Sequence, residues 1–119
     1  MCSSDLKSDI SGTVITVPWH PKAIPGNPFP EKARKLWGGT VNWRSATAYD
    51  ATMAIAKGLQ KGYTREALQK VLHSPDFFVN GATGKIEFQE SGDIKGKAIL
   101  VKVQPSKNST ANYDFFPLQ

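Results

Sequence analysis

Residues 11–30 read SGTVITVPWHPKAIPGNPFP, and two features of this stretch decide the fold. The β-branched run at residues 13–17 is bounded by a glycine and a proline, which predicts a strand. Its nearly continuous apolar character suits a sheet that is covered on both faces. Five prolines follow, at positions 18, 21, 25, 28 and 30. Because proline fixes φ and removes an amide donor, this segment is expected to be an extended loop or a crossover.

Two short helices are predicted on either side of a longer one. The first covers residues 31–37, with Pro30 at its first position and a Gly-Gly pair at its end. The third begins after Thr64, a good N-cap, and runs over residues 65–73. The buried face of the third helix is predicted to comprise Ala67, Leu68, Val71 and Leu72.

The helix between them begins after Asn42 or Ser45, either of which suits an N-cap, and runs to about residue 61. Its apolar residues form a broad stripe with many small side chains, which favours close packing against a sheet. The stripe comprises Ala48, Ala51, Ile55 and Leu59, with Tyr49, Met53 and Ala56 beside it.

Two strands are predicted after the helices, at residues 85–89 and 97–103. The polar tail from Pro105 is left without an element until the aromatic residues 113–118. One strand before the helices and two after them make a sheet too small to bury the helical faces. A Pro-rich loop of this length is also unusual in a small compact domain. Both points predict that partner structure is missing from this α/β chain.

Composition excludes several classes of protein. The 119 residues carry a net charge of +5, but their lysines and arginines are scattered and are not interleaved with aromatic residues, so no nucleic-acid partner is expected. No apolar run approaches the length of about 20 residues that spans a bilayer. The single cysteine, Cys2, gives no information on compartment.

The first ten residues are set apart from the fold. Residues 2–6 resemble the translation of a sequencing adapter, so residues 1–10 are interpreted as a non-native or disordered leader. No signal peptide is recognisable there. Residues 11–119 carry all the predicted strands and helices.

Three pieces of the chain, in order, resemble the type I periplasmic solute-binding proteins, in particular the branched-chain amino-acid-binding receptors of ABC transporters. The first is the strand of residues 12–17 leading into Pro18-Trp19. The second is the helix with Ala48-Tyr49-Asp50-Ala51, followed by the helix of residues 65–73. The third is Gly84-Lys85-Ile86-Glu87-Phe88 with Ser91-Gly92-Asp93 and the strand that follows.

The resemblance implies that residues 11–119 are the C-terminal segment of a solute-binding receptor and contribute to both of its lobes. Each lobe is then a three-layer αβα sandwich, and the fold is truncated at its N-terminus. The resemblance places the first and last strands in the second lobe, the helices on the first lobe, and the Pro-rich segment in a crossover. It also implies a periplasmic or extracytoplasmic subunit of an ABC importer that binds an amino acid or related small solute by cleft closure, without catalysis or cofactor. A membrane permease is then the partner. The alternative is an extracytoplasmic sensory ligand-binding domain of a signalling receptor.

Four residues are candidates for ligand contact. Trp19 follows a strand end, where ligands bind in open α/β sheets, so it either stacks on a ligand or packs beneath the Pro-rich loop; packing is favoured. Trp43 and Arg44 open the long helix, whose N-terminus favours anions, but a docking Trp and a surface Arg are the favoured alternative. Tyr49 is the fourth candidate and belongs to a Tyr-Asp pair shared with the family. The pair is interpreted as structural, with the Tyr49 ring packing against the sheet and Asp50 serving the helix cap or dipole.

Catalytic and metal sites are not expected. The carboxylates show no spacing that pairs two of them on one face, which argues against acid–base catalysis. His20 and His73 lie far apart in the sequence and have no cysteine partners nearby, so no zinc site is predicted.

Overall fold

The computed structural model describes residues 10–118. Of the expected leader, residues 1–9 lie outside the described part, as does Gln119. The adapter interpretation of residues 2–6 therefore stays a prediction.

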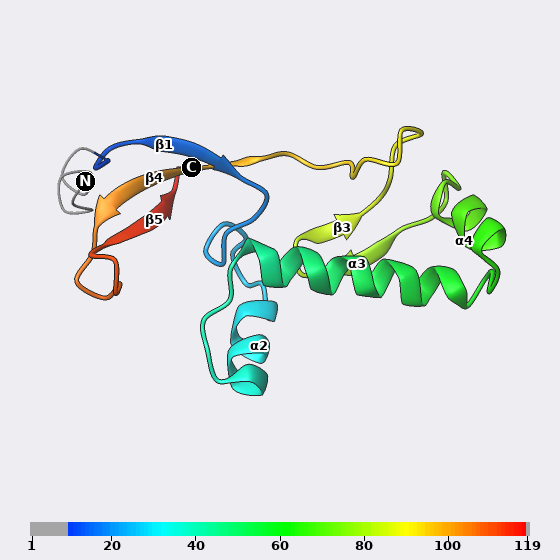
Figure 1. Ribbon diagram of the computed structural model, residues 1–119, viewed down its shortest axis with the longest axis horizontal. Coiled ribbons are helices and arrows are strands. Elements are labelled where there is room, and N and C mark those ends of the chain that lie inside the picture. Colours follow the sequence, from blue (N-terminus) through cyan, green and yellow to red (C-terminus); the bar gives the residue numbers. More distant parts are fainter. Residues whose placement is uncertain (1–9, 119) are drawn as a thin grey trace, which may run out of the picture.

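The chain forms two bodies that lie end to end (Figure 1). The strand body is an antiparallel sheet with the order β1-β4-β5. The helical body holds three helices and a two-stranded hairpin. The strand body comprises β1 (Val14–Val17), β4 (Ile99–Pro105) and β5 (Tyr113–Pro117). The helical body comprises α2 (Phe29–Trp37), α3 (Trp43–Leu59), α4 (Arg65–Leu72), β2 (Val79–Gly81) and β3 (Gly84–Ile86).

Two segments connect the bodies. Residues 18–28, which hold four of the eight prolines, lead from β1 to α2, and residues 87–98 lead from β3 back to β4. The Pro-rich stretch is thus the crossover that the sequence predicted. The chain extends over 52 × 32 × 31 Å with a radius of gyration of 17.6 Å. A compact domain of this size would have a radius of about 13 Å, so the chain does not close around one core.

Helix starts follow the predicted caps. The side chain of Asn42 accepts a hydrogen bond from the Arg44 N–H at 2.9 Å, which selects Asn42 over Ser45 as the cap of α3. Thr64 Oγ1 accepts from the Ala67 N–H at 3.1 Å at the start of α4. Helix α2 begins slightly earlier than expected, at Phe29, and Pro30 lies in its first turn.

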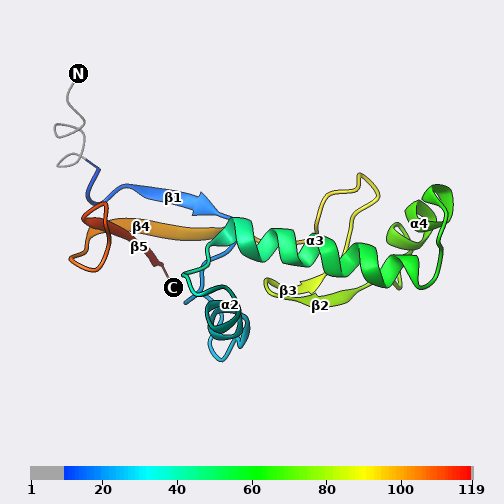
Figure 2. The ribbon, with the colours of Figure 1, turned by 60° about the horizontal axis from the view of Figure 1, so that its bottom comes forward.

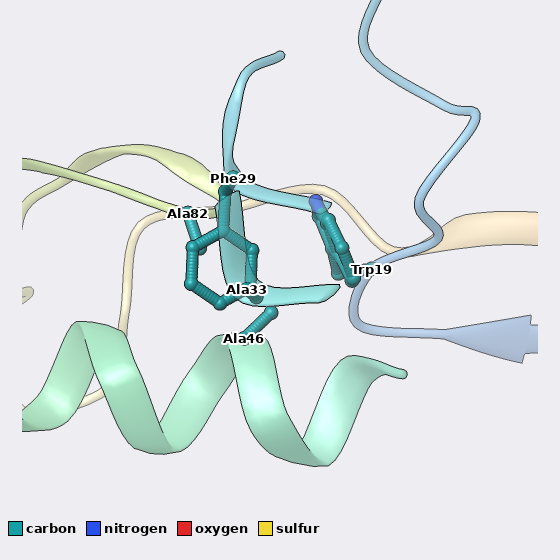
Figure 3. Packing of buried hydrophobic residues seen from close by; sticks show 5 residues of the cluster. All are labelled: Trp19, Phe29, Ala33, Ala46 and Ala82. Atoms are coloured by element: carbon teal, nitrogen blue, oxygen red, sulfur yellow. The ribbon is translucent and has the colours of Figure 1, made fainter. Parts of the chain in front are cut away.

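The core of the helical body lies where the crossover, two helices and the hairpin turn meet. Trp19 and Phe29 pack edge to face with ring centroids 5.9 Å apart, as Figure 3 shows. Ala33, Ala46 and Ala82 surround them. A second cluster, farther along α3, comprises Ala54, Phe77, Val79 and Ile86. These small and aromatic side chains hold α2 and the hairpin against α3.

Helix α3 buries a different face from the predicted apolar stripe, which the described residues leave exposed, as expected of a sheet too small to cover the helices. Its buried positions follow a spacing of four: Ala46, Asp50, Ala54 and Gly58. A methyl group on Gly58 would overlap the side chain of Leu68, so small residues let α4 approach this face. The predicted stripe points outward, with Ile55 47% and Leu59 42% exposed. The hairpin and α4 occupy the small-residue face, and no described element covers the apolar stripe.

The strands differ from expectation in three respects. β3 ends at Ile86 and pairs with β2, which the sequence analysis did not predict. β5 was also not predicted, and it pairs with β4 along Val101–Pro105. β1 was expected to be covered on both faces, but Val14 is 47% and Ile15 38% exposed. Short strands lack a periodic signal long enough to recognise.

Candidate functional site

A groove of about 1040 Å³ lies at the junction of the two bodies, where both crossovers leave the strand body. One wall is formed by the ends of β1 and β5 and the start of β4. The other is formed by the first crossover together with Thr47 of α3 and Thr83 of the hairpin turn. Residues 94–98 of the second crossover complete the groove. Figure 2 shows both crossovers passing between the two bodies.

Trp19 is the one predicted ligand residue that lines the groove. Its side chain is 1% exposed and packs on Phe29, which supports the packing interpretation. Its indole N–H has no hydrogen-bond partner among the described residues. Trp19 thus supports the groove wall from inside the core, and direct contact with a ligand stays a prediction.

Trp43 and Arg44 do not line the groove. Arg44 is exposed, and its guanidinium lies 4.5 Å from the centre of the Trp43 ring. Trp43 in turn packs against the cluster around Trp19. The arrangement matches the docking Trp and surface Arg that the sequence analysis favoured. On the same helix, Thr47 is the residue that reaches the groove.

Tyr49 and Asp50 have different roles. The Tyr49 ring lies 4.9 Å from that of Phe29, away from the groove lining, and is 38% exposed. Asp50 is 3% exposed and accepts hydrogen bonds from the Ala82 N–H at 2.5 Å and the Thr83 N–H at 3.0 Å. Its carboxylate also accepts from Thr83 Oγ1. Asp50 is structural, as expected, but it binds the hairpin turn instead of the helix N-terminus.

Sequence reasoning missed most of the groove. The lysines at positions 22, 85, 95 and 97 and the threonines at positions 16, 47 and 83 line it, and none was a predicted ligand residue. They come from stretches that are separate in the sequence and meet only in the folded chain. Lysines between a turn and an extended segment look like ordinary surface residues, so the sequence held no local signal for them.

Two ionisable side chains near the groove, Glu87 and His20, have shifted pKa values. Lys85 Nζ lies 2.9 Å from Glu87 Oε1. The hydrogen bond from Lys85, aided by the positive charges of Lys85 and Lys95, lowers the pKa of the Glu87 carboxyl. On the first crossover, partial burial lowers the pKa of His20, opposed by a hydrogen bond to the Phe115 backbone and by the charge of Asp114.

Two searches of the described residues bear on other functions. In residues 10–118, no helix combines the length and apolar character that crossing a bilayer requires. In the same part of the chain, no three histidine, cysteine, aspartate or glutamate side chains gather as a set of metal ligands.

Comparison with solved structures identifies the fold. The chain matches a leucine-binding protein from Thermotoga maritima with a TM-score of 0.67 and 24% identity, over 90% of this chain and 30% of that one. The chain carries part of the type I periplasmic-binding fold. An ABC-type branched-chain amino acid transporter from Rhodopseudomonas palustris matches with a TM-score of 0.71 and 16% identity, over 92% of this chain and 30% of that one.

A third match to the type I fold is an ABC transporter substrate-binding protein from Desulfitobacterium hafniense in complex with Leu. Its TM-score is 0.63 and its identity 20%, over 90% of this chain and 32% of that one. The chain thus spans about 30% of the length of these structures. No family model matches the chain, and no curated protein matches its sequence.

Proposed function

We propose that this chain is the C-terminal part of a solute-binding receptor of an ABC importer, and that residues 11–119 contribute to both lobes. The supporting observation is the match of at least 90% of the chain to substrate-binding proteins of ABC transporters, one of them in complex with Leu. In this proposal the strand body belongs to one lobe and the helical body to the other. The sensory-domain alternative gains no support from these structures.

The groove supports a binding role. It lies between the two bodies and is bordered by both crossovers. Ligand sites occur preferentially between domains, and a change of angle between the bodies would widen or narrow the groove. The function of the receptor is then capture of an amino acid or related small solute by cleft closure, without covalent chemistry.

The exposed apolar surface supports a larger receptor. Ile55 and Leu59 on α3 and Val14 and Ile15 on β1 are all more than a third exposed. A stable monomer rarely leaves continuous apolar faces in water, because burying them contributes much of the folding free energy. In the proposed receptor these faces pack against the remaining structure of the two lobes. The receptor acts outside the cytoplasm and delivers its solute to a permease.

The proposal is tested on the protein encoded by the complete gene. Titration calorimetry with amino acids, starting with leucine, should give saturable binding with one solute per chain. Small-angle scattering should show a smaller radius of gyration in the bound state. Absence of saturable binding across the panel, or chemical conversion of a solute, would contradict the proposed function.

Thr47 offers a sharper test of the groove. Thr47 lines the groove. The hydroxyls of Thr47 and Thr52 each donate to the carbonyl one helical turn earlier, at 2.9 Å in each case. Thr47→Val should weaken solute binding about threefold to tenfold through loss of a hydroxyl contact. Thr52→Val, which removes an equivalent hydroxyl outside the groove lining, should leave affinity unchanged. Equal effects of the two substitutions would place the solute elsewhere.

A further inference from the structure

The groove is lined by four lysines, at positions 22, 85, 95 and 97, and by no aspartate or glutamate among the described residues. Lys85 pairs with Glu87, whose carboxylate offsets its charge. The other three form no ion pair with a described residue. The ammonium of Lys22 instead lies 5.6 Å from the centre of the Phe116 ring. The groove therefore carries a positive charge that the described residues do not neutralise.

The remaining lining is largely apolar. Ile24, Ile94 and Leu100 contribute aliphatic side chains, and Trp19 supports the wall. Low-dielectric walls concentrate the field of nearby charges, so lysines at the rim of such a groove act more strongly than lysines on a flat surface. This combination fits a solute with an apolar part and an anionic group.

We propose that the groove selects its solute by charge, and that it takes a carboxylate-bearing solute with a net negative charge. The carboxylate lies toward the lysines of the two crossovers, and the carbon skeleton lies along the aliphatic wall. The inference rests on the proposed function, because it assigns the class of solute to the same site. A cationic solute is disfavoured, since no acidic side chain among residues 10–118 lines the groove to receive it.

The size of the effect follows from simple electrostatics. A carboxylate a few ångströms from one ammonium gains about a fivefold affinity even in water, and more near apolar walls. Two or three lysines whose charges are partly screened by water give a preference of about tenfold or more for an anion over a neutral molecule of the same shape. The preference should shrink as salt is added, because these lysines are exposed to solvent.

Matched pairs of a carboxylate and its amide test the proposal on the protein encoded by the complete gene. Glutamate with glutamine, and 4-methylpentanoate with 4-methylpentanamide, differ in charge and hardly in shape. Titration calorimetry at low salt should give about tenfold tighter binding for the anion of every pair that binds. An amide that binds as tightly as its carboxylate would overturn the charge proposal.

A pair of double variants shows whether the groove lysines cause the preference. Lys95→Gln/Lys97→Gln should reduce the preference for the anion to about twofold. Lys61→Gln/Lys107→Gln removes the same total charge from exposed positions outside the groove lining and should retain it. Equal effects of the two double variants would overturn the assignment to this groove.

The two proposals fail in different ways. If no solute of either pair binds and none of the amino acids in the wider panel binds, the proposed function is wrong and the charge proposal falls with it. If solutes bind without preference for the anion, the charge proposal alone is wrong and the receptor assignment stands.

Discussion

Asp50 joins α3 to the β2–β3 turn through three donors: two backbone N–H groups and the hydroxyl of Thr83. The sequence identified this aspartate as structural but assigned it to its own helix. Its true partners lie far along the chain, and nothing in the local sequence points to them. A buried carboxylate surrounded by donors is costly to alter, because each donor loses its acceptor.

Asp50→Asn should destabilise the receptor by about 1–3 kcal/mol, since the amide replaces one accepting oxygen with a donor that faces other donors. Urea unfolding of the full-length protein measures the change. Asp76→Asn, at an exposed position, is the control and should alter stability by less than about 0.5 kcal/mol. Equal unfolding midpoints for the two variants would show that the hairpin contact contributes nothing.

Gly81 is required by the same contact. A methyl group at this position would overlap the Asp50 carboxylate. Gly81→Ala should therefore cost about 1–3 kcal/mol as the turn moves away from α3. Gly96→Ala adds the same methyl group where no atom lies within 4 Å and should leave the melting temperature nearly unchanged. Equal melting temperatures for the two variants would show that the contact does not require a glycine at position 81.

His20 gives a dependence on pH. Partial burial lowers its pKa, so the folded protein binds a proton at this site less readily than the unfolded chain. The resulting contribution to stability is complete above the ordinary histidine pKa and is lost as pH falls toward the lowered value. His20→Gln should flatten the stability profile between about pH 7 and 5, the range in which histidine titrates. An unchanged slope of stability against pH would show that His20 does not cause this pH dependence.

At the scale of elements, the sequence predicted helices better than strands. Asn42 and Thr64 are the caps of α3 and α4 because their side chains satisfy helix N–H groups, a local interaction that the sequence records. β2 and β5 were missed because they are short and depend on pairing with other strands. The sequence did not reveal that the hairpin and α4 pack on the small-residue side of α3, but the exposure of its larger apolar residues agrees with the predicted lack of partner structure.

The exposed stripe of α3 predicts opposite effects in two contexts. Ile55→Glu/Leu59→Glu should make the 119-residue chain more soluble, since both side chains are exposed there. In the full-length receptor the same change should reduce the free energy of unfolding by about 2–4 kcal/mol, because it places charges in a buried interface. The control Gln60→Glu changes an exposed neighbour and should alter neither the solubility of the 119-residue chain nor the stability of the receptor. A neutral effect in both proteins would mean that the stripe has no partner.

At the scale of the whole molecule, the imbalance between helical surface and strands was visible in the sequence, and the extended shape has the same cause. The crossover was also predictable, because prolines 18, 21, 25 and 28 forbid regular structure there. The groove was not predictable, since Thr47, Thr83 and the lysines of two crossovers meet only in three dimensions. Of the four predicted ligand residues, one lines it.

The central claim is that these residues are one part of a two-lobe receptor and do not form a self-sufficient domain. Thermal unfolding of the 119-residue chain at several protein concentrations tests it most directly. The account predicts a broad transition that shifts with concentration, together with self-association in analytical ultracentrifugation, because apolar faces of α3 and β1 are exposed. A sharp, concentration-independent transition of a monomer would contradict it.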